Sequence, residues 1–152
     1  MRTILRSSAA LTAIILIFLT VAGCAGIGSP TTTYSYDPLF SFPGSKTYRW
    51  ADAKPTSWRD PLVEANVRFL ADRELQAKGL TPQLDKAALV VWMSYESSPN
   101  GYELRALSLN VTGAEGNALV WRGLAAGAIR TDAAAGELPK VVAGMLASFP
   151  PK

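Results

Sequence analysis

Residues 87–95 read AALVVWMSY, and this apolar run decides how the rest of the chain must be arranged. Valines and aromatic rings in a short run favour a strand at the centre of a sheet. Pro99, Asn100 and Gly101 follow closely and predict a turn. The chain should therefore reverse and place its next strand beside the first.

The next segment, residues 102–112, alternates in polarity as a strand with two different faces does. One face holds Leu104, Ala106, Ser108 and Asn110, and the other holds Arg105, Leu107, Leu109 and Val111. A second turn at 113–117 leads to a third strand over 118–129. Short connections between the three strands predict an antiparallel meander.

A helix is predicted upstream of this meander. Asp60 is a favourable N-cap, and Pro61 suits the first helical position. Lys78 and Gly79 suit its C-terminal end. Its apolar stripe comprises Val63, Val67, Leu70, Ala71 and Leu75.

A second helix is predicted over 137–148, where Pro150 and Pro151 stop it. Its apolar stripe comprises Leu138, Val141, Val142, Met145, Leu146 and Phe149. An early strand is expected at 46–50, with Tyr48 and Trp50 on one side.

The predicted element order is β-α-β-β-β-α. Each helix has one apolar stripe, so each must cover a sheet. We therefore predict an α+β fold, a two-layer sandwich with a four-stranded, largely antiparallel sheet and two helices packed on one face. Residues 34–152 would form this single domain.

The first 24 residues look like an export signal. Arg2 and Arg6 precede an apolar core of residues 9–21, which is too short for a stable transmembrane helix. The quartet Val-Ala-Gly-Cys at 21–24 resembles the bacterial lipobox, in which cleavage falls between Gly23 and Cys24 and acyl chains are joined to the cysteine. We predict a signal peptide at 1–23, and a lipidated Cys24 with a flexible tether at 24–33.

The tethered domain should face the periplasm. Ala25 follows the cysteine where an aspartate would favour the inner membrane, which resembles the outer-membrane default. Without Arg2 and Arg6 the net charge falls from +3 to +1, since 13 basic and 12 acidic residues remain. So small a net charge gives no electrostatic field that would attract nucleic acid.

The aromatic residues after the tether have two interpretations. Tyr34, Tyr36, Phe40 and Phe42 would suit a membrane interface or the first core strand, and we favour the core.

The residue inventory argues against catalysis, metals and cofactors. The chain has no histidine, and its one cysteine would be acylated, so a zinc site and a Ser-His-Asp triad are excluded. Asp72 and Glu74 are two apart on a helix, which makes them solvated charges rather than a catalytic pair.

Three residues are candidates for ligand or partner contact: Trp92, Trp121 and Arg122. A guanidinium beside an indole could bind a carboxylate, phosphate or sugar. Alternation places Trp121 and Arg122 on opposite faces of one strand, however, so the structural interpretation is favoured, with Trp121 under a helix. Gly123 and Gly127 would mark a bulge or close packing.

The order of four short motifs resembles a known family. They are Lys-Thr-Tyr-Arg-Trp at 46–50, Asp-Lys-Ala-Ala-Leu-Val-Val at 85–91, Val-Trp-Arg-Gly at 120–123 and Phe-Pro-Pro at 149–151. Together with the lipobox they are similar to the bacterial lipoproteins of domain of unknown function 4136, although the acidic residue expected just before the central strand is displaced to Asp85. The resemblance implies an α/β envelope domain and supplies no catalytic residues.

Two classes of function fit these patterns. The first is a non-enzymatic interaction or structural module, anchored to the membrane through Cys24 and bound to an unidentified envelope protein. The second is a carrier or sensor of a small apolar or cell-wall-derived ligand, in a cleft lined by Trp92, Met93, Trp121 and Met145. An enzyme would need a mechanism that uses only carboxylates, and no such pairing is visible.

Overall fold

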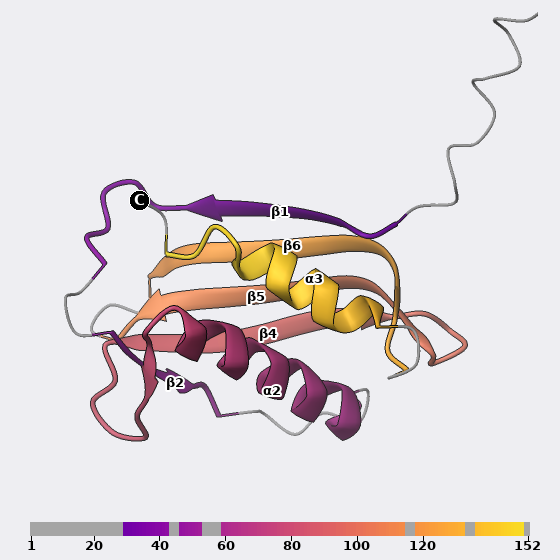
Figure 1. Ribbon diagram of the computed structural model, residues 1–152, viewed down its shortest axis with the longest axis horizontal. Helices are drawn as coiled ribbons and strands as arrows, with labels where there is room; N and C mark the ends of the chain where they lie inside the picture. The colour runs from indigo at the N-terminus through magenta and orange to yellow at the C-terminus, as the bar shows by residue number, and fades with distance from the viewer. Residues whose placement is uncertain (1–28, 43–45, 53–58, 115–117, 133–135, 151–152) are drawn as a thin grey trace, which may run out of the picture.

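The computed structural model describes residues 29–42, 46–52, 59–114, 118–132 and 136–150. Figure 1 shows one sheet with two helices packed against the same face. The strands are β1 Thr31–Tyr36, β2 Thr47–Trp50, β3 Thr81–Pro82, β4 Leu89–Ser97, β5 Glu103–Gly113 and β6 Leu119–Arg130. The helices are α2 Pro61–Ala77 and α3 Glu137–Leu146.

The sheet has six strands in the order β1-β6-β5-β4-β2-β3, so the predicted four-stranded, largely antiparallel sheet is wrong. The meander β4-β5-β6 is antiparallel as expected, and β1 adds an antiparallel strand at its edge. In contrast, β2 runs parallel to both β3 and β4, because α2 carries the chain back across the sheet before β4 begins. The result is a mixed sheet in an α+β sandwich.

Helix α2 begins and ends as the sequence predicts. The Asp60 carboxylate accepts bonds from the backbone N–H of Leu62 (2.8 Å) and Val63 (3.4 Å). Past the C-terminal end, Gly79 has a φ of 81°, which an L-residue with a side chain rarely adopts. All five residues of the predicted stripe are buried against the sheet.

The core between the sheet and the helices includes a correction to the predicted alternation. Leu104 and Leu107 are both buried, although strict alternation places them on opposite faces. The register between β5 and β6 shifts between Leu104 and Ala106, opposite Gly127 with its φ of 124°. A bulge at Gly127 was one of the two predicted interpretations, and this register shift confirms it. Strand β5 also has an extra residue, Arg105, opposite the step from Glu96 to Ser97 of β4, and this irregularity brings Leu104 onto the core face.

The aromatic residues near the start of the domain divide into two groups. Phe40 and Phe42 pack against the core, as expected. Tyr34 and Tyr36 belong to β1 and are 52% and 44% exposed, so their assignment to the core is wrong. Strand β1 also begins at Thr31, inside the segment predicted as tether. Within the described ranges, no helix is long and apolar enough to cross a membrane.

Candidate functional site

A groove of about 820 Å³ opens where the short parallel strands β2 and β3 end beside α2. Its walls come from three segments: residues 48–52 at the end of β2, Arg68 and Asp72 on α2, and residues 82–86 after β3. Ligands of sheets with parallel strands often bind at the carboxyl ends of those strands. This polar groove is therefore the candidate functional site.

The most constrained group in the groove is the carboxylate of Asp72. Its Oδ1 atom accepts a 2.7 Å bond from the Tyr48 hydroxyl and a 2.8 Å bond from Trp50 Nε1. Both donors point the same way because they are two residues apart on one strand. We expected Asp72 to be a solvated charge, and that expectation is wrong, since the carboxylate ties β2 to α2. Glu74 pairs at the surface with Arg73 at 3.1 Å.

The phenol of Tyr48 remains protonated at any physiological pH. Burial raises its pKa far above the ordinary value of 10.0, and the adjacent Asp72 carboxylate raises it further. A phenol in this state is a hydrogen-bond donor and not a general base or a nucleophile. The hydrogen bond between Tyr48 and Asp72 therefore positions β2 against α2.

Basic and acidic side chains line the groove in equal number. The basic ones are Arg49, Arg68 and Lys86, and the acidic ones are Asp52, Asp72 and Asp85. The guanidinium of Arg68 lies 5.1 Å from the centroid of the Trp50 ring, within the range of a cation–π contact, and reaches the Ala51 carbonyl at 3.5 Å. Such a lining suits a polar ligand that carries both charges.

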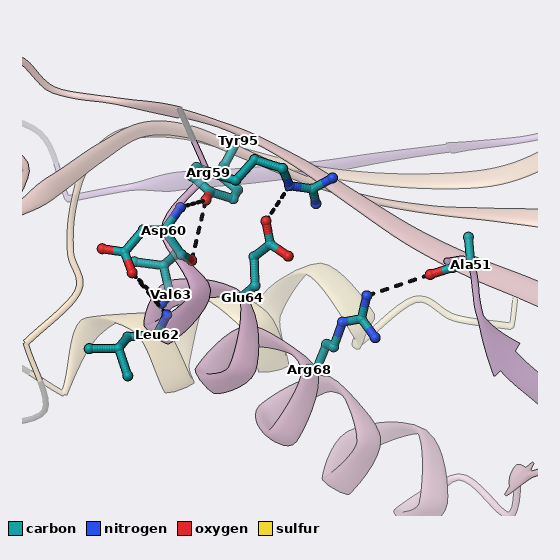
Figure 2. A network of polar contacts seen from close by, with 8 residues as sticks. All are labelled: Ala51, Arg59, Asp60, Leu62, Val63, Glu64, Arg68 and Tyr95. Atoms are coloured by element: carbon teal, nitrogen blue, oxygen red, sulfur yellow. Dashed lines mark hydrogen bonds and ion pairs between the residues drawn. The ribbon is translucent and has the colours of Figure 1, made fainter. Parts of the chain in front are cut away.

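A second polar network fixes the N-terminal end of α2 (Figure 2). The Tyr95 hydroxyl of β4 accepts a 2.6 Å bond from the Asp60 N–H and donates to the Asp60 carbonyl at 3.4 Å. Arg59 pairs with Glu64 in the first turn of the helix. These contacts hold α2 on the sheet at one end, as the Asp72 contacts do farther along the helix.

The residues singled out in the sequence lie on two faces of the sheet. Trp121 is buried in the core, where its ring packs against Phe149 with centroids 5.0 Å apart. It also lies over Gly123, where a Cβ would come 2.5 Å from the indole. Close packing at Gly123 is therefore confirmed. The indole N–H of Trp121 has no acceptor among the described residues.

Arg122 and Trp92 lie on the opposite face, on either side of Asn110. The sheet register places Asn110 between them, and Arg122 Nε donates a 2.8 Å bond to Asn110 Oδ1. Asn110 is fully buried, which alternation alone did not predict because it assigned this position to a polar face. Its Nδ2 has no partner in the described structure.

Other sequence candidates are placed elsewhere or not at all. Met93, Trp121 and Met145 are packed in the core, so they do not line the expected cleft. Gly23 and Cys24 lie outside the described residues. Across the described ranges, no three residues of His, Cys, Asp or Glu are grouped to hold a metal ion.

Most of the chain matches one known protein family. The family model described as domain of unknown function (DUF4136) matches residues 32–151. The chain belongs to this family. The predicted membership is thus confirmed, and the match covers every helix and strand described above except Thr31, the first residue of β1. No curated protein matches the chain.

Solved structures show the same fold at low identity. The PelC dodecamer from Paraburkholderia phytofirmans matches with a TM-score of 0.53 at 15% identity, covering 78% of this chain and 95% of that one. A single-substitution variant of that PelC dodecamer gives 0.52 at 16%. A PDZ domain protein from Parabacteroides distasonis gives 0.60 at 11%, covering 94% of this chain but 40% of its own. The DUF4136 domain therefore shares its fold with these proteins.

Two features of the site were not found from sequence. Tyr48 and Trp50 were expected on one side of a strand, but nothing in the sequence linked them to Asp72, which is more than 20 residues away. The groove itself depends on β3, whose two residues carry no recognisable strand pattern.

Proposed function

We propose that this chain is a lipid-anchored protein of the bacterial cell envelope, facing the periplasm from the outer membrane, with an interaction or structural role and no catalytic one. The lipobox-like quartet before Ala25 supports the anchor and its membrane. The anchor would hold the DUF4136 domain close to the membrane surface, because the seven peptide bonds from Cys24 to Thr31 span at most about 25 Å.

The observation that carries the non-catalytic role is the way in which Asp72 is used. Its Oδ1 accepts bonds from Tyr48 and Trp50, and Tyr48 stays a neutral donor. This carboxylate thus holds strand β2 and helix α2 together instead of acting as a reactive group. PelC, which shares the fold, is a dodecamer, and this supports a role in which copies of the chain associate.

In-cell crosslinking followed by mass spectrometry tests the role. The tagged full-length chain should capture the same envelope proteins, copies of itself included, in repeated experiments. A Cys24→Ser chain, which lacks the proposed anchor, should lose that capture. Equal capture by the two chains would contradict a tethered role, and enzymatic turnover of any envelope substrate by the purified protein would contradict a non-catalytic one.

A second candidate function is the binding of a small cell-wall-derived ligand in the groove. About 820 Å³ exceeds the ~300 Å³ of small ligand pockets, and the mixed charges favour a peptide-bearing fragment with both an ammonium and a carboxylate group over an apolar one. Calorimetry with a peptidoglycan-derived tripeptide tests this. Binding that is lost in Arg68→Ala and kept in Arg105→Ala, on a distant strand, supports it, whereas heat changes equal to those of buffer rule it out.

A further inference from the structure

The outer edge of β1 presents unpaired backbone groups in the described structure. Asp37 N–H donates to the Val120 carbonyl at 3.0 Å, which fixes the phase of the ladder between β1 and β6. Because hydrogen bonding alternates along an antiparallel pair, Thr31, Thr33 and Ser35 bond to β6. The backbone N–H and C=O groups of Thr32, Tyr34 and Tyr36 therefore point away from the sheet.

The opposite edge of the sheet is protected against strand addition, whereas β1 is not. Strand β3 has only two residues, and one is Pro82, which has no N–H to donate. Lys46 and Lys86 flank that edge. Strand β1 has six exposed residues, TTTYSY, without a charge or a proline. Short length, charged residues and proline are the usual protections of an edge strand. Pro30 and Asp37 flank β1, but none of these protections lies within its six residues.

Helix α3 contacts one face of β1. Gly144 of α3 lies over Thr32, where a Cβ would come 3.3 Å from Thr32 Oγ1. The rings of Tyr34 and Tyr36 stack on the helix side of the sheet, 6.3 Å apart at 14°. In Figure 1 β1 forms the free upper border of the sheet, with α3 lying toward β6.

We propose that β1 is a self-association surface, at which two copies of the chain pair β1 against β1 in antiparallel orientation about a twofold axis. This inference rests on the proposed interaction role and names the partner as a second copy. In the register centred on Tyr34, Thr32 lies opposite Tyr36 of the other copy, and Tyr34 lies opposite Tyr34. All outward-pointing backbone groups of the three residues then form hydrogen bonds.

The sequence of β1 favours a second copy over a charged partner strand. An isologous interface must be complementary to itself, and an uncharged strand brings no like charges together when it pairs with its copy. Aromatic and β-branched residues would meet across the pair, which stabilises antiparallel strands. A short tether to one membrane would also raise the effective concentration of the copies.

Disulfide crosslinking in native membranes tests the proposed pair. Residues opposite each other in a hydrogen-bonded antiparallel pair have Cα atoms about 5.5 Å apart, within disulfide reach. Full-length Tyr34→Cys should form a disulfide-linked dimer under mild oxidation. The unsubstituted chain controls for disulfides formed by Cys24. Leu84→Cys controls for nonspecific crosslinking, because Leu84 is exposed beside the opposite edge of the sheet. Tyr34→Cys dimers no more abundant than those of Leu84→Cys would overturn the proposal.

A second variant separates this proposal from the proposed function. Tyr34→Lys places two like charges at the centre of the pair. It should halve the mass of the detergent-solubilised dimer, or of each β1-paired dimer within a larger assembly. The control Leu84→Lys should leave the mass unchanged. An assembly that survives Tyr34→Lys overturns the β1 interface but leaves the interaction role intact. A disulfide between the Tyr34→Cys chain and a different protein would overturn the choice of a second copy.

Discussion

The hydroxyl of Tyr48 donates a 2.7 Å hydrogen bond to Oδ1 of Asp72, which joins strand β2 to helix α2. The same oxygen accepts the indole N–H of Trp50. One carboxylate on the helix thus holds two aromatic residues of the strand, and it forms a wall of the polar groove. A substitution of Asp72 should therefore change the groove and also reduce the stability of the fold.

Asp72→Ala should destabilise the domain by about 2–4 kcal/mol, because the buried Tyr48 and the half-buried Trp50 both lose their hydrogen-bond acceptor. Asp72→Asn should cost less, since its amide oxygen still accepts a bond. Urea unfolding followed by circular dichroism measures both. The matched control is Asp85→Ala at the exposed rim of the groove, and an equal loss in that variant would show that the effect is not specific to the contact.

Stability should fall as the pH rises above about 10, the ordinary pKa of tyrosine in an unfolded chain. Burial raises the pKa of Tyr48 and of Tyr95 in the folded state, so the unfolded chain loses these protons first. The free energy of unfolding should then decrease by up to about 1.4 kcal/mol per pH unit for each residue. Tyr48→Phe should flatten this slope in urea melts between pH 9 and 12. A slope unchanged by the substitution would contradict this account.

Gly123→Ala should destabilise the domain by about 1–3 kcal/mol, because the new Cβ would lie 2.5 Å from the Trp121 ring. Adding Trp121→Phe, with its smaller ring, should relieve the clash. The measurement is a double-mutant cycle of unfolding free energies, in which the two changes together should cost less than their sum. Strict additivity would mean that the ring and the glycine are not in contact.

Arg122→Ala should cost about 1–3 kcal/mol, since Arg122 donates to the fully buried Asn110. Arg105 offers a matched control on the neighbouring strand, where its 3.8 Å pair with Glu96 is exposed at the surface. Arg105→Ala should change stability by less than about 0.5 kcal/mol. Thermal melts of the two variants test whether Arg122 has a structural role. A loss of stability in Arg122→Ala no larger than that in Arg105→Ala would contradict this role.

The parts of the fold that were predictable have strong local signals. Asp60, Pro61 and Gly79 fix the ends of α2 through capping and backbone geometry, which depend on a few neighbouring residues. The meander of β4, β5 and β6 was visible because each strand is long and its connections are short. The family membership was found from short motifs in β2, at the start of β4, in β6 and after α3.

The edges of the sheet could not be predicted, because edge strands need not alternate in polarity. Strand β1 is exposed on both faces, so its threonines resembled a linker, and β3 is too short to show any period. The Asp72 contact was hidden for a different reason. The sequence alone predicts that a carboxylate on a helix faces solvent. Only the packing of α2 over β2 brings Asp72 to Tyr48 and Trp50.

Metabolic labelling with a palmitate analogue, followed by membrane fractionation, tests the central claim of an acyl-anchored envelope protein most directly. The account predicts that the full-length chain is labelled and sediments with the outer membrane. Cys24→Ser should abolish the label and release the protein from that fraction, although the domain still folds. Labelling that persists in Cys24→Ser, or membrane retention unchanged by it, would contradict the account.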